Sequence, residues 1–223
     1  MDKRYHWILD NGHGSINPTQ LETNSRSING KIMTSGKRSF KFPKGSQFEN
    51  QCLIEGSNNR DVVNYLTMLM DQLEIQYTVL VPGYKDMSLS ARCEKANLIA
   101  KNYEYPLPSI LLSVHHNAFG KSWNNANGVD SFYWKSDQGY SGGGKRIAEI
   151  INPSLVKWSG LRNRGVKGRD FKILRSTSMP AVLVECGFMT NLKEAEYLMT
   201  EEAKQNTAKG LFEGIMNIEQ NGY

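Results

Sequence analysis

Hydrophobic residues follow two different spacings along the chain, and the two spacings alternate. Short apolar runs typical of strands occur at Tyr5–Asp10, Ile75–Val81, Ser109–Ala118, Gly128–Lys135, Phe171–Arg175 and Pro180–Gly187. Apolar residues at helical spacing occupy 57–73, 88–100, 141–151, a segment that starts at Asn191, and 200–218. We therefore predict one α/β domain over residues 1–223, with a twisted, mostly parallel sheet of about six strands and helices on both faces.

Polar residues stand at the ends of two of these strands. The apolar run Ile110–Val114 leads into His115, His116 and Asn117, and the first strand is followed by Asn11-Gly12-His13-Gly14. Ligands of open α/β sheets collect at the carboxyl edge of the strands, so these side chains stand where chemistry is expected. Glycines on both sides of His13 would let its loop approach a ligand closely. A polar turn without a function is the alternative at both places.

Two glutamates also stand at element ends. Glu55 lies just before or within the first turn of a predicted helix, where the helix dipole favours a carboxylate, and helix capping is the alternative to a functional role. Glu185 is the one charged residue of the buried strand Pro180–Gly187. Burial of a carboxylate costs free energy unless the group is paired or coordinated, so Glu185 requires an explanation. Alternation along the strand directs Cys186 to the opposite side.

Taken together, His13, Glu55, His115 and Glu185 suggest a metal-dependent hydrolase. Two histidines and one glutamate are a recognised ligand set of catalytic zinc in peptide-bond hydrolases, and they leave the fourth position for water. The four residues come from separated segments, so their spacing does not choose among metals or reactions. The residues alone favour this hypothesis without excluding others.

Five motifs occur in a fixed order along the chain. They are Asp10-Asn11-Gly12-His13-Gly14, Glu55 with Asn59 and Arg60, Ser113–Ala118, Asn163-Arg164-Gly165-Val166-Lys167, and Pro180–Asn191. Together they resemble the zinc-dependent N-acetylmuramoyl-L-alanine amidases, which include bacterial cell-wall hydrolases and phage endolysins. The resemblance extends from about Ile8 to the final helix. Asn11 stands where the family usually has proline. His116 stands where it often has a small residue, and we expect His116 to point away from the site because strand neighbours face opposite sides.

The resemblance implies a site for one zinc ion with three protein ligands, which are His13, Glu55 and His115. It implies that Glu185 takes a proton from the water that the zinc binds and passes it to the leaving amine. The bond that would be hydrolysed is the amide between the lactyl group of N-acetylmuramic acid and L-alanine of the stem peptide, so peptidoglycan is the expected partner. Asn117 and Arg164 are the candidate substrate contacts, although either residue could equally support loops.

A basic loop is predicted over Asn24–Phe48, and it looks like extra material relative to the family. Its six basic residues occur without an acidic one, and they are Arg26, Lys31, Lys37, Arg38, Lys41 and Lys44. The loop could flank a groove for an anionic polymer, or it could be a solvated excursion. The net charge of +5 favours polyanionic partners without choosing among them. We do not expect nucleic acid, because we expect no aromatic stacking platform among these basic residues.

The ends and the apolar content of the chain bear on where it acts. No segment approaches the roughly 20 apolar residues of a membrane-spanning helix, so no membrane insertion is expected. The first residues, Met1-Asp2-Lys3-Arg4, contain no apolar signal region. We expect a monomer that is made in the cytoplasm and acts on the cell wall after release, as a phage or prophage endolysin does. A domain excised from an exported enzyme is the alternative.

Three cysteines, Cys52, Cys93 and Cys186, match no zinc or disulfide framework, so reduced thiols are expected. One of them provides a competing function, which is a cysteine-dependent peptidoglycan hydrolase that uses Cys186 with a histidine. A non-catalytic cell-wall-binding module, suggested by the basic loop, is a second alternative.

Overall fold

A seven-stranded sheet lies at the centre of the computed structural model, which describes residues 3–17, 33, 34, 36–102 and 106–223. The strands are β1 His6–Asn11, β2 Tyr77–Val79, β3 Ser109–Asn117, β4 Val129–Ser136, β5 Gly139–Tyr140, β6 Asn163–Arg169 and β7 Ala181–Phe188. Their order is β2-β1-β3-β7-β4-β5, with β6 paired to β4. All pairs are parallel except β4 with β7 and β4 with β5. The mostly parallel α/β domain predicted from the sequence is confirmed.

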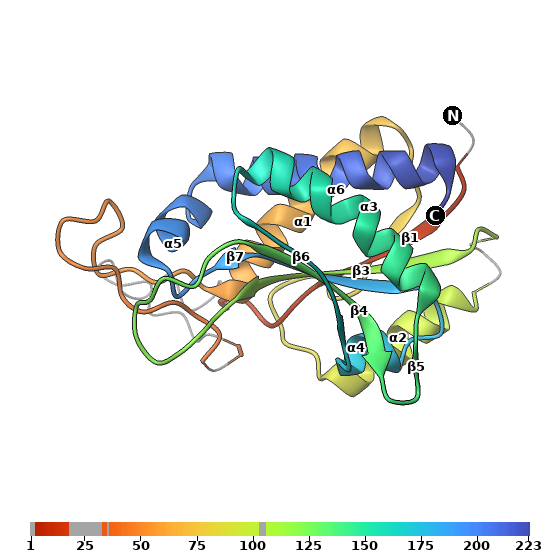
Figure 1. Ribbon diagram of the computed structural model, residues 1–223, viewed down its shortest axis with the longest axis horizontal. Coiled ribbons are helices and arrows are strands. Elements are labelled where there is room, and N and C mark those ends of the chain that lie inside the picture. Colours follow the sequence, from red (N-terminus) through yellow and green to blue (C-terminus); the bar gives the residue numbers. More distant parts are fainter. Residues whose placement is uncertain (1–2, 18–32, 35, 103–105) are drawn as a thin grey trace.

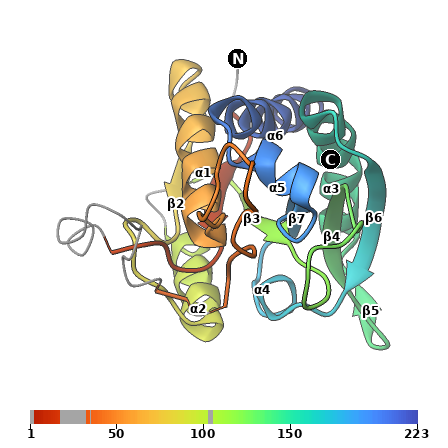
Figure 2. The same ribbon diagram turned by 90° about the vertical axis from the view of Figure 1, so that its left-hand side faces the viewer.

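Helices cover both faces of this sheet (Figures 1 and 2). They are α1 Glu55–Gln72, α2 Leu89–Ala100, α3 Gly142–Ser159, α4 Lys172–Arg175, α5 Leu192–Leu198 and α6 Glu201–Asn221. One face packs against α1, α3 and α6 through a core that includes Leu66, Ile151 and Ile215. The other face packs against α2 and α4 through a core that includes Leu111 and Leu183. Burial of these apolar side chains stabilises the layered arrangement.

Three predicted elements differ from the structure. The segment Phe171–Arg175, predicted as a strand, forms the short helix α4 with Phe171 as its N-cap. The segment 141–151, predicted as a helix, extends as α3 to Ser159 and ends at Gly160. Helix α1 begins at Glu55 with Ile54 as its N-cap, two residues before the predicted start at residue 57. Glu55 therefore lies in the first turn of α1, which is one of the two positions predicted for it.

The part of the basic loop that the structure describes packs against the loop after β3. Phe42 is buried, and its ring lies 5.7 Å from that of Phe48 and 5.6 Å from that of Trp123. Phe40 also contacts Trp123, at 5.4 Å between ring centroids. Aromatic residues thus do alternate with Lys41, which corrects the expectation made for this loop. These rings pack on one another and on Trp123. The residues 24–32 and 35 of the predicted loop lie outside the described ranges.

Within the described ranges, every helix is too short or too polar to cross a membrane.

Candidate metal centre

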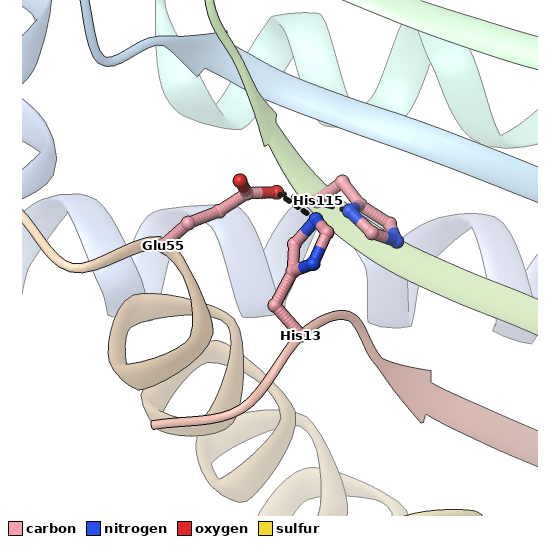
Figure 3. A group of neighbouring side chains, drawn as sticks. All are labelled: His13, Glu55 and His115. Atoms are coloured by element: carbon pink, nitrogen blue, oxygen red, sulfur yellow. Dashed lines mark hydrogen bonds and ion pairs between the residues drawn. The ribbon is translucent and has the colours of Figure 1, made fainter. Parts of the chain in front are cut away.

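Three polar side chains from separate elements meet at the carboxyl edge of the sheet (Figure 3). His13 follows β1, Glu55 is the first residue of α1, and His115 lies near the end of β3. The Nε2 atom of His13 lies 3.3 Å from Glu55 Oε1, and the Nδ1 atom of His115 lies 2.9 Å from the same oxygen. One ligand atom from each residue lies within 4.8 Å of the others. The sequence prediction that these three residues converge agrees with this geometry.

The spacing of these atoms fits a metal ion. A tetrahedral zinc ion with bonds of about 2.0–2.1 Å separates two of its ligand atoms by about 3.4 Å. The distance of 3.3 Å between His13 Nε2 and Glu55 Oε1 matches that separation, whereas His115 Nδ1 lies closer to the same oxygen, at 2.9 Å, because the two atoms are hydrogen-bonded. The donor set of two imidazoles and one carboxylate is also that of catalytic zinc sites. Both the geometry and the chemistry of His13, Glu55 and His115 therefore fit the ion that the resemblance implies.

Glycines let the three ligands come this close. A Cβ atom on Gly12 would lie 2.1 Å from His115 Cε1, and one on Gly56 would lie 2.0 Å from the carbonyl oxygen of Gly14. His13 itself has a φ of 62°, in the left-handed region that non-glycine residues seldom adopt. Such a conformation persists only where the surroundings hold it.

Side chains of α1 hold the His13 loop from one side. Asn59 Nδ2 donates to the carbonyl oxygen of Gly12 at 2.9 Å. Arg60 Nη1 donates to the carbonyl oxygens of His13 and Gly56, each at 2.8 Å. The run Glu55 to Arg60 thus supplies one ligand and fixes the loop of another, which explains why these residues occur together in one motif.

The described part of the basic loop also contacts the segments that carry His13 and Glu55. The backbone N–H of Gly14 donates to Thr34 Oγ1 at 2.6 Å, and this hydroxyl donates in turn to Asp86 Oδ2 at 2.6 Å. The backbone N–H of Glu55 donates to the carbonyl oxygen of Lys37 at 3.0 Å. The described part of the loop therefore supports the segments that carry two of the three ligands.

His116 points away from the metal centre, as expected of a neighbour on a strand. Its Nδ1–H donates to Asn59 Oδ1 at 2.7 Å, and its Nε2 accepts from Asn58 Nδ2 at 2.9 Å. Burial lowers the pKa of His116 to about 4, so the ring is neutral. His116 therefore supports α1 against β3 and is not a ligand.

Glu185 lies beside the metal centre on β7. Its cross-strand partner on β3 is His115, and paired residues of neighbouring strands face the same side. The Oε2 atom is buried, and within the described part of the chain it has no hydrogen-bond partner. Burial raises the pKa of Glu185 to about 8, and the positive charges of His115 and Lys37 oppose that rise. A carboxyl group with a pKa near neutrality suits proton transfer.

Glu55 has the opposite electrostatic balance. Burial alone would raise its pKa, but hydrogen bonds and charge from His115 and His13 outweigh burial and lower it. The carboxylate of Glu55 is therefore ionised, as a metal ligand must be. The environments of the two glutamates thus differ in the direction that a metal ligand and a proton carrier require.

The two candidate substrate contacts, Asn117 and Arg164, both reach Asp130 at the start of β4. Arg164 Nε donates to Asp130 Oδ2 at 2.7 Å, and Asn117 Nδ2 lies 3.5 Å from the same oxygen. Lys167 Nζ bonds the other carboxylate oxygen, Oδ1. Sequence reasoning did not single out Asp130, although it is the one acidic residue in the run 128–135. The role of Asn117 and Arg164 in substrate binding stays a prediction.

Cys186 is fully buried in the core beneath α1, α3 and α6, on the face opposite to Glu185. Burial raises the pKa of its thiol, which disfavours the reactive thiolate. The predicted separation of Cys186 from the site agrees with this placement. The geometry argues against the thiol as a nucleophile.

The sequence matches the N-acetylmuramoyl-L-alanine amidase family, Amidase_3, over residues 8–217. The chain belongs to this amidase family. Among curated relatives, it is 35% identical over 108 residues to the N-acetylmuramoyl-L-alanine amidase LytC of Bacillus subtilis. The matched region covers 48% of this chain and 21% of LytC. It is 30% identical over 150 residues to the amidase CwlM of Bacillus licheniformis, and this matched region covers 66% of this chain and 53% of CwlM. The chain thus matches only about a fifth to a half of these amidases.

Solved structures of the amidase family share the whole fold. An N-acetylmuramoyl-L-alanine amidase from Clostridium difficile 630 superposes with a TM-score of 0.71 at 25% identity, covering 99% of each chain. The catalytic domain of the amidase CwlV from Bacillus (Paenibacillus) polymyxa superposes with a TM-score of 0.68 at 23% identity, covering 96% of this chain and 97% of that one. Because the identity to CwlV is only 23%, this likeness shows that the fold is shared and nothing more.

Proposed function

We propose that this chain is a zinc-dependent amidase that hydrolyses peptidoglycan between the lactyl group of N-acetylmuramic acid and L-alanine of the stem peptide. Family membership supports the reaction class. The observation that carries the proposal is the convergence of His13, Glu55 and His115 on one point, with Glu185 next to His115 on the adjacent strand.

The residues of the chain divide the chemical work. His13, Glu55 and His115 would hold the ion, and zinc, when bound, would supply the Lewis acidity that activates water and polarises a carbonyl group. Glu185 accepts the proton of the attacking water at its carboxylate and delivers it to the nitrogen of the leaving L-alanine. Within the described part of the chain the buried Oε2 atom of Glu185 has no hydrogen-bond partner, so the ionised carboxylate has an acceptor available for that proton. The hydrogen bonds from Asn59 and Arg60 to the backbone of Gly12 and His13 keep His13 in place during the reaction.

Digestion of purified peptidoglycan by the zinc-loaded protein tests this proposal. We expect free stem peptides with new amino groups on L-alanine, together with intact glycan chains. New reducing ends of sugars would instead identify a glycosidase. Glu185→Gln should lower the rate by about 10²–10⁴-fold, the usual contribution of general acid–base catalysis. Glu149→Gln on α3, where the side chain is 51% exposed, is the matched control and should keep the wild-type rate.

The same assay separates the competing functions. A cysteine hydrolase would lose activity with iodoacetamide and keep it with a chelator, whereas the proposed enzyme shows the reverse. A non-catalytic binding module would release no peptides at all, and Glu185→Gln would leave its effect on cell walls unchanged. We also propose that the protein is released from lysed cells, as an endolysin is, and that it is a monomer.

A further inference from the structure

A line of polar side chains crosses the sheet beyond the metal centre. On β3, His115 is paired with Glu185 of β7, and Glu185 is paired in turn with Asp130 of β4. Residues paired in this way face the same side of the sheet, so the three side chains form one row. Neighbouring strands lie about 4.8 Å apart, which places Asp130 about 10 Å from His115 along the row. The row links the proposed proton carrier to a second charged cluster.

Two cations share one buried carboxylate in this cluster. Asp130 is 1% exposed, and its two carboxylate oxygens bind Arg164 and Lys167 of β6. A register shift between β4 and β6 sets Arg164 and Gly165 opposite Asp130, so that both cations can reach one carboxylate. One cation would suffice to balance Asp130. Asp130 nevertheless carries two cations on one carboxylate, and Arg164 also interacts electrostatically with the buried Glu194.

Both cations also keep unused hydrogen-bond donors that face solvent. The side chains of Arg164 and Lys167 are 30% and 32% exposed. Within the described part of the chain, Lys167 Nζ donates to Asp130 alone, and Arg164 donates to Asp130 and to the carbonyl oxygen of Asn127. An ammonium has three donors and a guanidinium has five, so donors remain on each. The Arg164 guanidinium is held further by the ring of Phe188, 4.8 Å away.

We infer that Arg164 and Lys167, oriented by Asp130, form a subsite for a carboxylate group on the stem peptide of the substrate. This inference rests on the proposed function. An extended peptide advances about 3.3–3.6 Å per residue, so a carboxylate on the second stem residue lies about 7 Å beyond the scissile carbonyl group. Arg164 and Lys167 start on β6, three strand spacings from His115. Their side chains reach back to Asp130, which lies two spacings from His115 and one from Glu185, and these two spacings bracket that distance. Asp130 is thus a positioning residue, and Lys167 is a determinant of specificity.

Two synthetic muramoyl peptides that differ at one group provide the test. One carries a free carboxylate on its second residue, and the other carries a carboxamide there. We expect the zinc-loaded wild-type protein to hydrolyse the carboxylate form with a kcat/KM about tenfold higher, mainly through a lower KM, as a partly exposed charge-assisted hydrogen bond provides. Lys167→Met should bring the ratio of the two kcat/KM values close to one, and Lys167→Arg should retain the preference.

The ratio isolates the subsite from general damage. A change that only loosened β6 or disturbed Glu185 would slow both peptides equally and leave the ratio unchanged. Lys145→Met is the matched control, because Lys145 is also an ion-paired lysine but lies on α3, where it pairs with Glu149. It should keep the wild-type ratio. A wild-type ratio of one, or a tenfold ratio that survives in Lys167→Met, would overturn the inference.

Binding measurements separate this inference from the proposed function. If the wild-type protein hydrolyses neither peptide, the proposed function fails. Calorimetric titration with the two peptides then still decides the subsite. Tighter binding of the carboxylate form supports the subsite, and equal binding refutes it.

Discussion

The raised pKa of Glu185 has a consequence for stability that can be measured without the reaction. In an unfolded chain a glutamate releases its proton near pH 4.5, whereas burial keeps Glu185 protonated in the metal-free folded protein up to about pH 8. Between these values the folded state holds one proton more than the unfolded state. The contribution of Glu185 to the free energy of unfolding therefore falls as the pH rises through this window and levels off above it.

The size of the effect follows from the shift. Each pH unit inside the window changes the free energy of unfolding by about 1.4 kcal/mol for one group. Glu185→Gln cannot ionise, so its free energy of unfolding relative to wild type should increase with pH by about 4 kcal/mol between pH 5 and pH 8. Urea denaturation in the presence of a chelator, repeated at each pH unit, measures this difference. Titrating groups distant from Glu185 are shared by the two proteins and cancel.

A second glutamate variant serves as the control. Glu94→Gln removes a glutamate from the exposed surface of α2, outside the site, and should not reproduce the pH dependence of Glu185→Gln. The reasoning would be refuted by a difference between Glu185→Gln and wild type that stays within about 0.5 kcal/mol from pH 5 to pH 8, the scatter expected of an ordinary surface change.

Three further outcomes are expected from the surroundings of the site. Gly12→Ala should lower zinc affinity at least about tenfold, because its Cβ would enter the His115 ring, and competition with a chelator measures this. Thr34→Ala should weaken zinc binding by a similar factor through the freed N–H of Gly14, while Thr34→Ser keeps the hydroxyl and should bind like wild type. Equal affinities for the two Thr34 variants would contradict that role. Cys186→Ala should retain peptidoglycan hydrolysis while lowering the melting temperature, since it removes a buried core side chain.

The longer elements that bury apolar side chains could be predicted from the sequence, whereas the polar strand β6 and the short helix α4 could not. Strand β6, with the sequence Asn163–Arg169, has one aliphatic residue, Val166, and therefore lacks the alternation that identifies a strand. It pairs with β4 because the neighbouring strand offers a free edge. Helix α4 is too short for a helical period to be visible, so its apolar residues Ile173 and Leu174 suggested a strand instead.

The metal centre could be predicted in its residues but not in its supports. His13, Glu55 and His115 each stand at an element end, which is a local property of the sequence. Their support comes from contacts between distant segments, such as Thr34 with Gly14. The same is true of the Asp130 cluster, which arises from the parallel pairing of β4 with β6 and lies beside Glu185 through the antiparallel pairing of β4 with β7. Sequence alone gives no register for strands that lie more than fifty residues apart.

The central claim is that His13, Glu55 and His115 bind one zinc ion together. Crystals of the zinc-loaded protein, measured on both sides of the zinc absorption edge, test it most directly. One anomalous peak is predicted, bonded to His13 Nε2, His115 Nδ1 and the Glu55 carboxylate at about 2.0–2.2 Å. An anomalous peak at a cysteine or at the surface, with these three side chains left bonded only to one another, would contradict the claim.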